Sequence, residues 1–228
     1  MIGIVDVGGG MRGAYGAGIL DYCMMHDIHF DYCIGVSAGS ANCISYLAGQ
    51  IHRNYEFYTK YIFRKDYMGI KNFLQTHSYL NLDYIYGTLS NSDGESPLDF
   101  DAIQRSDKIL KVVCTDAETG YPVYFGNEDV HKDDYAIIKA SSCVPVIDEP
   151  YPVYDRFYYD GGISDPIPFR KALEDGCDKV VIVLTRPKDF YRDPKKDMAL
   201  SRLIERKYPQ AAVQLASRAV TYNISLDQ

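Results

Sequence analysis

Short apolar runs that end in glycine alternate with helical patterns in the N-terminal part of the chain. The run IGIVDV at residues 2–7 predicts a buried strand, because a strand covered on both faces lacks polar alternation. Small and apolar residues at helical spacing follow at 13–25, then a second strand at about 32–36 and a small-residue helix at 38–49. Two strand–glycine–helix units in succession predict parallel strands joined by crossover helices, and hence an α/β sandwich.

The later pattern predicts an aromatic helical cover and then a mixture of strands and helices. Residues 52–100 are rich in tyrosine and phenylalanine and poor in strand signals, so we expect mostly helix over one end of the sheet. We interpret their aromatic side chains first as core and only second as a ligand-binding wall. The remaining predictions are a hairpin at 108–116 and 121–126, a helix at 134–142, a strand at 156–160, a helix from Pro168, a strand at 178–184, and helix over 199–226 with a break near Pro209.

Length and composition indicate one ordinary globular domain. The chain has 228 residues, 46% hydrophobic and 24% charged, with no internal repeat or linker, which predicts a single domain over 1–228. A net charge of −7 without a basic block argues against nucleic acid as a partner. We find neither a signal peptide nor an apolar run of about 18 residues, so we expect a cytoplasmic protein without a transmembrane segment.

The cysteines and histidines give no metal or disulfide signature. Six cysteines form no C-x-x-C pair and mostly lie in apolar runs, so we expect buried, reduced thiols rather than a disulfide framework. His26 and His29 in HDIH follow a helical pattern, where histidine and aspartate commonly solvate a turn. We therefore predict no metal site.

A glycine-rich turn, VGGGMRG, follows the first predicted strand. Gly8, Gly10 and Gly13 fit G-x-G-x-x-G, the dinucleotide-binding fingerprint. That fingerprint also requires an acid at the end of the second strand, whereas Asp31 precedes that strand. A nicotinamide-dependent oxidoreductase is thus a minor alternative, and we predict no cofactor.

The same glycines suit an oxyanion hole, since they let backbone N–H groups point at an anion without obstruction. The next turn, GVSAG, places Ser37 between Gly35 and Gly39 in the G-x-S-x-G pattern of a nucleophile elbow. Neighbouring parallel strands would bring both turns to one sheet edge. We choose Gly9 and Gly10 as donors, while Arg12 either binds a phosphate or polar head group or forms a structural ion pair.

A serine nucleophile needs a base, and no histidine is well placed to serve. After Ser37 the histidines are His52 and His77, in the aromatic cover, and His131, in a charged loop. The alternative is Asp160, which ends a predicted aromatic strand and precedes two glycines that clear space around one carboxylate, Gly161 and Gly162.

Three motifs in this order resemble those of the patatin-like phospholipases, especially the small bacterial branch: GGGMRG at 8–13, GVSAG at 35–39 and DGG at 160–162. The stretches ASSCVPVIDEPY from Ala140 and VVIVLTRP from Val180 are also similar, so the resemblance covers nearly the whole chain. It implies a patatin-like three-layer α/β sandwich, with a mostly parallel central sheet and helices on both faces. It further implies a Ser–Asp dyad without histidine and without a cofactor.

Carried onto this sequence, the resemblance implies hydrolysis of a lipid ester, presented in solution or at a membrane surface. Ser37 would be the nucleophile and Asp160 the proton acceptor, and the oxyanion hole would be the loop Gly8, Gly9, Gly10, Met11, Arg12 and Gly13. The alternative from another class is a catalytically silent lipid-binding or regulatory protein of the same fold, which need not keep the dyad. Patatin-like proteins often continue past the RAVTYN helix, so we expect this chain to be short at its C-terminus.

Overall fold

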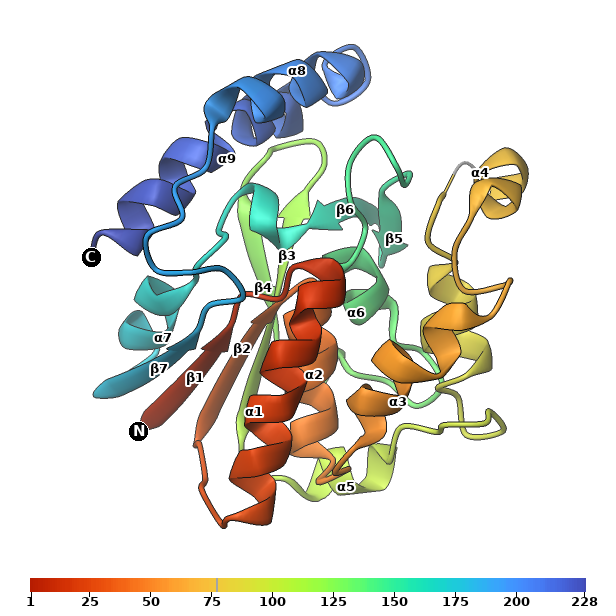
Figure 1. The fold of residues 1–228 in the computed structure, drawn as a ribbon, viewed down its shortest axis with the longest axis vertical. Coiled ribbons are helices and arrows are strands. Elements are labelled where there is room, and N and C mark those ends of the chain that lie inside the picture. Colours follow the sequence, from red (N-terminus) through yellow and green to blue (C-terminus); the bar gives the residue numbers. More distant parts are fainter. Residues whose placement is uncertain (77) are drawn as a thin grey trace.

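The computed structural model describes residues 1–76 and 78–228 (Figure 1). Within these residues seven strands form one sheet. In chain order the strands are β1 (Ile2–Asp6), β2 (Tyr32–Val36), β3 (Ile109–Asp116), β4 (Pro122–Phe125), β5 (Tyr151–Val153), β6 (Arg156–Asp160) and β7 (Lys179–Val183). The helices are α1 (Gly13–Met25), α2 (Ala38–Leu47), α3 (Arg53–Thr59), α4 (Ile70–Thr76), α5 (Phe100–Arg105), α6 (Ala136–Ser141), α7 (Phe169–Glu174), α8 (Pro194–Ile204) and α9 (Pro209–Leu226).

Four strands form the parallel part of the sheet, in the order β7, β1, β2 and β3. Their register aligns Asp6 with Gly35 and Val36 with Val113, so the carboxyl ends of these strands lie at one edge. The two predicted strand–glycine–helix units therefore form as expected. β4, β5 and β6 are antiparallel additions on the β3 side.

Successive residues of the buried strands face two different cores. Ile4 and Cys33 pack in the core beneath α1 and α2, while Val5 and Ile34 pack against Ala172 of α7. Figure 1 shows α1 and α2 side by side across one face. Helices thus cover both faces, as predicted, because both sides of β1 and β2 are apolar and must be removed from water.

β2 and β6 lie end to end along the same side of β3. Val112 and Val113 pair with both β2 and β4, and Cys114 and Thr115 pair with both β4 and β6. A strand has only two sides, so β6 must occupy the side that β2 has left. Since β6 runs antiparallel, the carboxyl ends of β2 and β6 meet head to head.

The region 52–100 is less regular than predicted. Its helical elements are short: α3, a 3₁₀ turn at Tyr61–Phe63, α4 and a turn of π-helix at Tyr84–Thr88. The C-terminal region breaks before Pro209 as predicted, but α8 already begins at Pro194, capped by the Asp193 side chain. β5 was missed, since three residues with a central proline carry no periodic signal.

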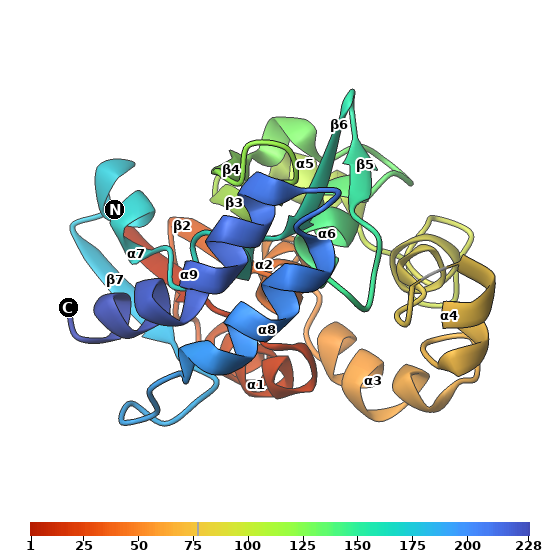
Figure 2. The ribbon, with the colours of Figure 1, turned by 90° about the horizontal axis from the view of Figure 1, so that it is seen from above.

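Two helical regions frame the carboxyl ends of the parallel strands. Seen from above in Figure 2, α8 and α9 lie together over the sheet, with α3 and α4 to one side of it. All six cysteines are buried as free thiols. Among the described residues, no helix combines the length and apolar character needed to cross a bilayer.

Candidate active site

Ser37 occupies a strained turn between β2 and α2. Its backbone has φ 57° and ψ −129°, a conformation that costs a non-glycine residue about 1–3 kcal/mol. Three hydrogen bonds hold the turn. The Ser37 N–H donates to Ser141 Oγ (2.9 Å), Ser141 Oγ donates to the carbonyl of Val113 (2.7 Å), and Ser40 Oγ donates to the carbonyl of Ser37 (2.6 Å).

The glycines on either side of Ser37 allow close packing of backbone against backbone. A Cβ on Gly35 would lie 2.5 Å from the backbone N of Ser40, and a Cβ on Gly39 would lie 2.2 Å from the carbonyl oxygen of Asp6. Only glycine therefore lets α2 start directly against both its own strand and β1. The spacing of G-x-S-x-G follows from these two contacts.

The glycine loop after β1 takes a left-handed path. Gly8, Gly9 and Gly10 have φ of 61°, 110° and 60°, values that residues with a Cβ rarely adopt. A Cβ on Gly8 would also lie 2.1 Å from the carbonyl oxygen of Val36. The loop thus packs directly against the Ser37 turn, as expected for neighbouring parallel strands.

The N–H groups of this loop fall into two sets. Three already have acceptors inside the chain, namely those of Gly8 (Asp6 Oδ1, 2.9 Å), Arg12 (the carbonyl of Gly9) and Gly13 (the carbonyl of Gly10). The first donors of the short helical turn have no acceptor among the described residues: Gly9, Gly10 and Met11. The structure therefore narrows the six predicted loop residues to three whose N–H groups are free to bind an oxyanion.

A buried polar network that sequence reasoning missed braces the loop. Asp6 is fully buried, and its second carboxylate oxygen accepts from Asn42 Nδ2 (2.8 Å), which also donates to the carbonyl of Gly13 (2.9 Å). Burial raises the pKa of Asp6 to about 6, opposed by its hydrogen bonds from Asn42 and Gly8. The available signal was an acidic residue inside an otherwise apolar strand.

Asp160 reaches the Ser37 turn from the opposite direction, at the end of β6. Its carboxylate accepts from the Gly162 N–H (2.7 Å), and its own N–H donates to the carbonyl of Cys143 (2.8 Å). Gly161 is required as well, because a Cβ there would lie 2.2 Å from the carbonyl oxygen of Val113.

The Asp160 carboxylate and Ser37 line the same cavity. Burial raises the pKa of Asp160, and the nearby Ser37 side chain and the Gly162 N–H oppose this rise. The positive charges of Arg218 and Arg192 oppose it further. The structure therefore brings together the serine, the carboxylate and the free N–H groups that the three motifs supply.

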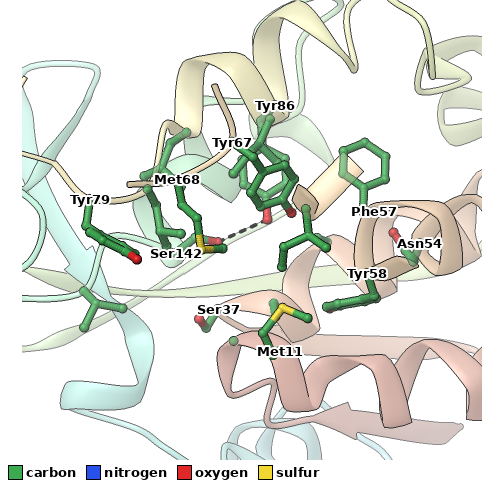
Figure 3. Close-up of a pocket in the computed structure, with 18 of the residues that line it drawn as sticks. Met11, Ser37, Asn54, Phe57, Tyr58, Tyr67, Met68, Tyr79, Tyr86 and Ser142 are labelled. Carbon is green, nitrogen blue, oxygen red and sulfur yellow. Dashed lines mark hydrogen bonds between the residues drawn. The ribbon is translucent and has the colours of Figure 1, made fainter. Parts of the chain in front are cut away.

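An apolar cavity of about 280 Å³ opens beside Ser37 (Figure 3). The aromatic cover forms one wall of it, and Tyr86 is hydrogen-bonded there to Ser142 (3.4 Å). Figure 3 shows side chains from both sides of the space around Ser37: Met11, Phe57, Tyr58, Tyr67, Met68 and Tyr79. The cover also holds a small core of its own, made of Phe57, Tyr61, Tyr67, Ile85 and Leu89. The aromatic residues thus form a core, as predicted first, and also line a cavity; that this cavity binds a ligand stays a prediction.

A second cavity, of about 180 Å³, lies next to the first. Ser37, Gly10 and Val144 line both cavities, while Asp160 lines only the second. Its walls carry four arginines, Arg12, Arg186, Arg192 and Arg218. No residue pattern in the sequence indicated this cluster beyond Arg12.

None of the described histidines lines either cavity. His29 contacts Asp27 (2.8 Å), and His52 contacts Asp21 (3.3 Å) at the surface. His26 ends α1 against the ring of Tyr22, and His131 forms an isolated bridge with Asp134. His77 lies outside the described residues.

Comparison with known proteins agrees with this geometry. A sequence model of the patatin-like phospholipases matches residues 7–173, which include the glycine loop, Ser37 and Asp160. The chain belongs to the patatin-like phospholipase family. The family consists of lipid acyl hydrolases. β7, α8 and α9 lie beyond the matched segment.

One curated protein similar in sequence to this chain is the uncharacterized protein YjjU of Escherichia coli strain K12. It is 27% identical over 225 residues, which cover 96% of this chain and 62% of that protein. This patatin-like chain thus spans less than two thirds of the relative's length.

Proposed function

We propose that this protein hydrolyses carboxylic esters of lipids through an acyl-serine intermediate, with Ser37 as nucleophile and Asp160 as base. The observation that carries the proposal is the head-to-head junction of β2 and β6 beside β3, because Ser37 directly follows β2 and Asp160 ends β6. The free N–H groups of Gly9, Gly10 and Met11 lie on the adjoining loop at the same sheet edge.

In this mechanism Asp160 accepts the Ser37 proton as the serine oxygen attacks the ester carbonyl. The negative charge on the tetrahedral carbonyl oxygen is stabilised by the loop N–H groups. The intermediate collapses, the carbon–oxygen bond to the alcohol breaks, and Asp160 returns its proton to the leaving alcohol. Water then attacks the acyl-serine with Asp160 again as base, releasing the fatty acid and restoring Ser37.

The environment of Asp160 suits this role. A free aspartate is a weak base towards a serine hydroxyl, and burial makes the carboxylate more basic by raising its pKa. The hydrogen bonds that oppose this rise come from Ser37 itself and from Gly162, so they also orient the carboxylate. The base is thus both strengthened and held in place.

The apolar cavity supports a lipid as the substrate. Its walls are aromatic and aliphatic side chains, and Ser37 lies at its edge. A fatty acyl chain placed there would leave its ester carbonyl at the serine, since concave apolar walls are what an acyl chain requires.

The test compares Ser37→Ala and Asp160→Asn with wild type on the octanoyl ester of p-nitrophenol. We expect each variant to lose about a thousandfold in kcat, and the double variant to lose little more, because the two residues act as a unit. Asp165→Asn is the matched control, since that acid pairs with Tyr124 and lines neither cavity. A fluorophosphonate probe should label wild type and not Ser37→Ala.

The pH profile and the histidines complete the test. The base acts only when ionised, so kcat should fall at low pH with a midpoint above the ordinary range of aspartate, and Asp160→Asn should lack this limb.

Alanine at any single histidine should leave turnover intact: His26, His29, His52, His77 and His131. Near-wild-type turnover by folded Asp160→Asn, or a thousandfold loss in a folded histidine variant, would refute the dyad. Absence of both labelling and turnover would favour a silent lipid-binding protein.

A further inference from the structure

The two cavities that meet at Ser37 have opposite chemistry. One is lined mostly by aromatic and aliphatic side chains, with Arg53 among its few polar residues, and the other contains four arginine side chains from separate parts of the chain. Arg12 lies within the glycine loop, Arg186 and Arg192 lie between β7 and α8, and Arg218 lies on α9. An ester held at Ser37 would therefore have an apolar space on one side and a cationic space on the other.

The arginines outnumber the carboxylates around them. Arg218 forms a two-bond ion pair with the buried Asp197, and Arg192 lies 3.8 Å from the same carboxylate. Arg12 and Arg186 have no ion pair within the described part of the chain. Positive charge is thus in excess in this cavity, in a chain whose net charge is −7.

The protein holds these like charges close together. Desolvation, and then the neighbouring Arg186, lowers the pKa of Arg12; desolvation, and then Arg218, lowers that of Arg192. The backbone of Arg192 is also fixed, because its N–H donates to Asn223 Oδ1 (2.8 Å) and its carbonyl accepts from Asn223 Nδ2 (3.1 Å). Cations held together without enough counter-charge favour the binding of an anion.

We propose that this arginine cavity binds the phosphate of a lipid with a phosphate monoester head group, and that such anionic esters are the preferred substrates of Ser37. The assignment rests on the proposed ester hydrolysis. In a phosphorylated glycerol ester only a few bonds separate the acyl carbonyl from the phosphorus. The acyl chain would enter the apolar cavity, the ester would lie at the shared residues Ser37 and Gly10, and the phosphate would face Arg12, Arg186 and Arg192.

The lining favours a monoester over a zwitterionic head group. A phosphate monoester carries close to two negative charges at neutral pH, and guanidinium groups match its oxygens in geometry and charge. A quaternary ammonium group would instead need an open aromatic face or a free carboxylate. The aromatic side chain in this cavity, Tyr222, already has Arg192 over its ring (5.5 Å). The carboxylate in this cavity, Asp160, is next to Ser37.

The experiment measures kcat/KM for three octanoyl esters of glycerol that differ only in the head group: phosphate monoester, phosphocholine and free hydroxyl. For wild type we expect the monoester to exceed the other two by about tenfold or more. Arg186→Gln should reduce the ratio of monoester to hydroxyl ester by about tenfold, since it removes charge-assisted hydrogen bonds to the phosphate oxygens. Arg186→Lys should lose less of the ratio. Arg202→Gln is the matched control, because it removes one positive charge from α8 outside the cavity.

The outcomes separate this assignment from the proposed function. Equal kcat/KM for all three esters, or an unchanged ratio in both Arg186→Gln and Arg192→Gln, would overturn the head-group assignment and leave ester hydrolysis standing. Inhibition of all three reactions by inorganic phosphate, without preference for the monoester lipid, would overturn it in favour of a free phosphate. No hydrolysis of any ester by wild type would refute the proposed function.

Discussion

The Ser37 turn depends on one hydroxyl group that comes from outside the three glycine motifs. Ser141 is fully buried at the end of α6, and its Oγ joins the Ser37 N–H (2.9 Å) to the carbonyl of Val113 (2.7 Å). Ser141→Ala would remove both hydrogen bonds. The Ser37 N–H, in a turn with φ 57°, would then lack a hydrogen-bond acceptor.

The magnitude follows from these contacts. Leaving the buried Ser37 N–H without an acceptor costs about 1–3 kcal/mol, and losing the hydrogen bond to the Val113 carbonyl costs about 1 kcal/mol, so we expect a loss of about 2–4 kcal/mol in unfolding free energy. For a chain of this size that corresponds to a fall in Tm of about 5–15 °C. Relaxation of the turn would also displace the Ser37 oxygen, and a displacement of about 1 Å can cost a hundredfold in rate. We therefore expect kcat to fall by about tenfold to a hundredfold with KM little changed.

Urea unfolding and steady-state hydrolysis of an octanoyl ester would measure the two effects, the latter at a temperature where both proteins are folded. Ser217→Ala is the matched control, because its hydroxyl donates only to the carbonyl of Val213 on the exposed face of α9. Stability within about 0.5 kcal/mol of wild type would refute the hydrogen-bond argument. Lost stability with wild-type kcat would show that Ser141 supports the fold without positioning Ser37.

Three further predictions concern the fold and the cavity. In a urea titration Gly39→Ala should destabilise the protein by more than about 4 kcal/mol, because its Cβ would lie 2.2 Å from the Asp6 carbonyl oxygen. Gly18→Ala is the control: a Cβ at that position on α1 has no neighbour within 4 Å, so this variant should be neutral or stabilising. Burial raises the pKa of Asp148 to about 6, so the stability that its protonation contributes is complete below about pH 3.8 and is lost as the pH rises through 6. Between pH 4 and 7 the unfolding free energy of wild type should therefore fall by about 3 kcal/mol relative to that of Asp148→Asn. Parallel stability curves for the two proteins would contradict this. Octanoate esters should exceed acetate esters in kcat/KM because of the apolar cavity, and equal values would argue against its role as an acyl site.

Much of the fold could be predicted because its signals are local. Apolar runs closed by glycine located β1 and β2, and the turn residues between two such runs located the β3–β4 hairpin. β5 and the start of α8 could not be located in the same way. A three-residue edge strand has no period to detect, and the first turn of α8 is polar with its proline at the N-terminus.

The candidate site was predictable only where a residue sits within a glycine motif. Ser37 and Asp160 carried such signals, because each needs a turn that excludes side chains. Ser141 hydrogen-bonds to the backbone of Ser37 and Val113, and Asp6 to the side chain of Asn42. These partners are far away in the sequence, so the bonds leave no spacing to recognise.

The sequence by itself determined where the backbone turns sharply and which side chains lie at those turns, because a conformation that requires glycine is marked by glycine in the local sequence. Tertiary structure alone decided how those turns meet. β6 pairs antiparallel with β3 on the side that β2 has left, and this pairing, rather than any spacing, brings Asp160 to Ser37. The arginine cavity likewise joins side chains from the first helical turn, from the segment between β7 and α8, and from α9. Their proximity depends on the packing of α8 and α9 above the sheet.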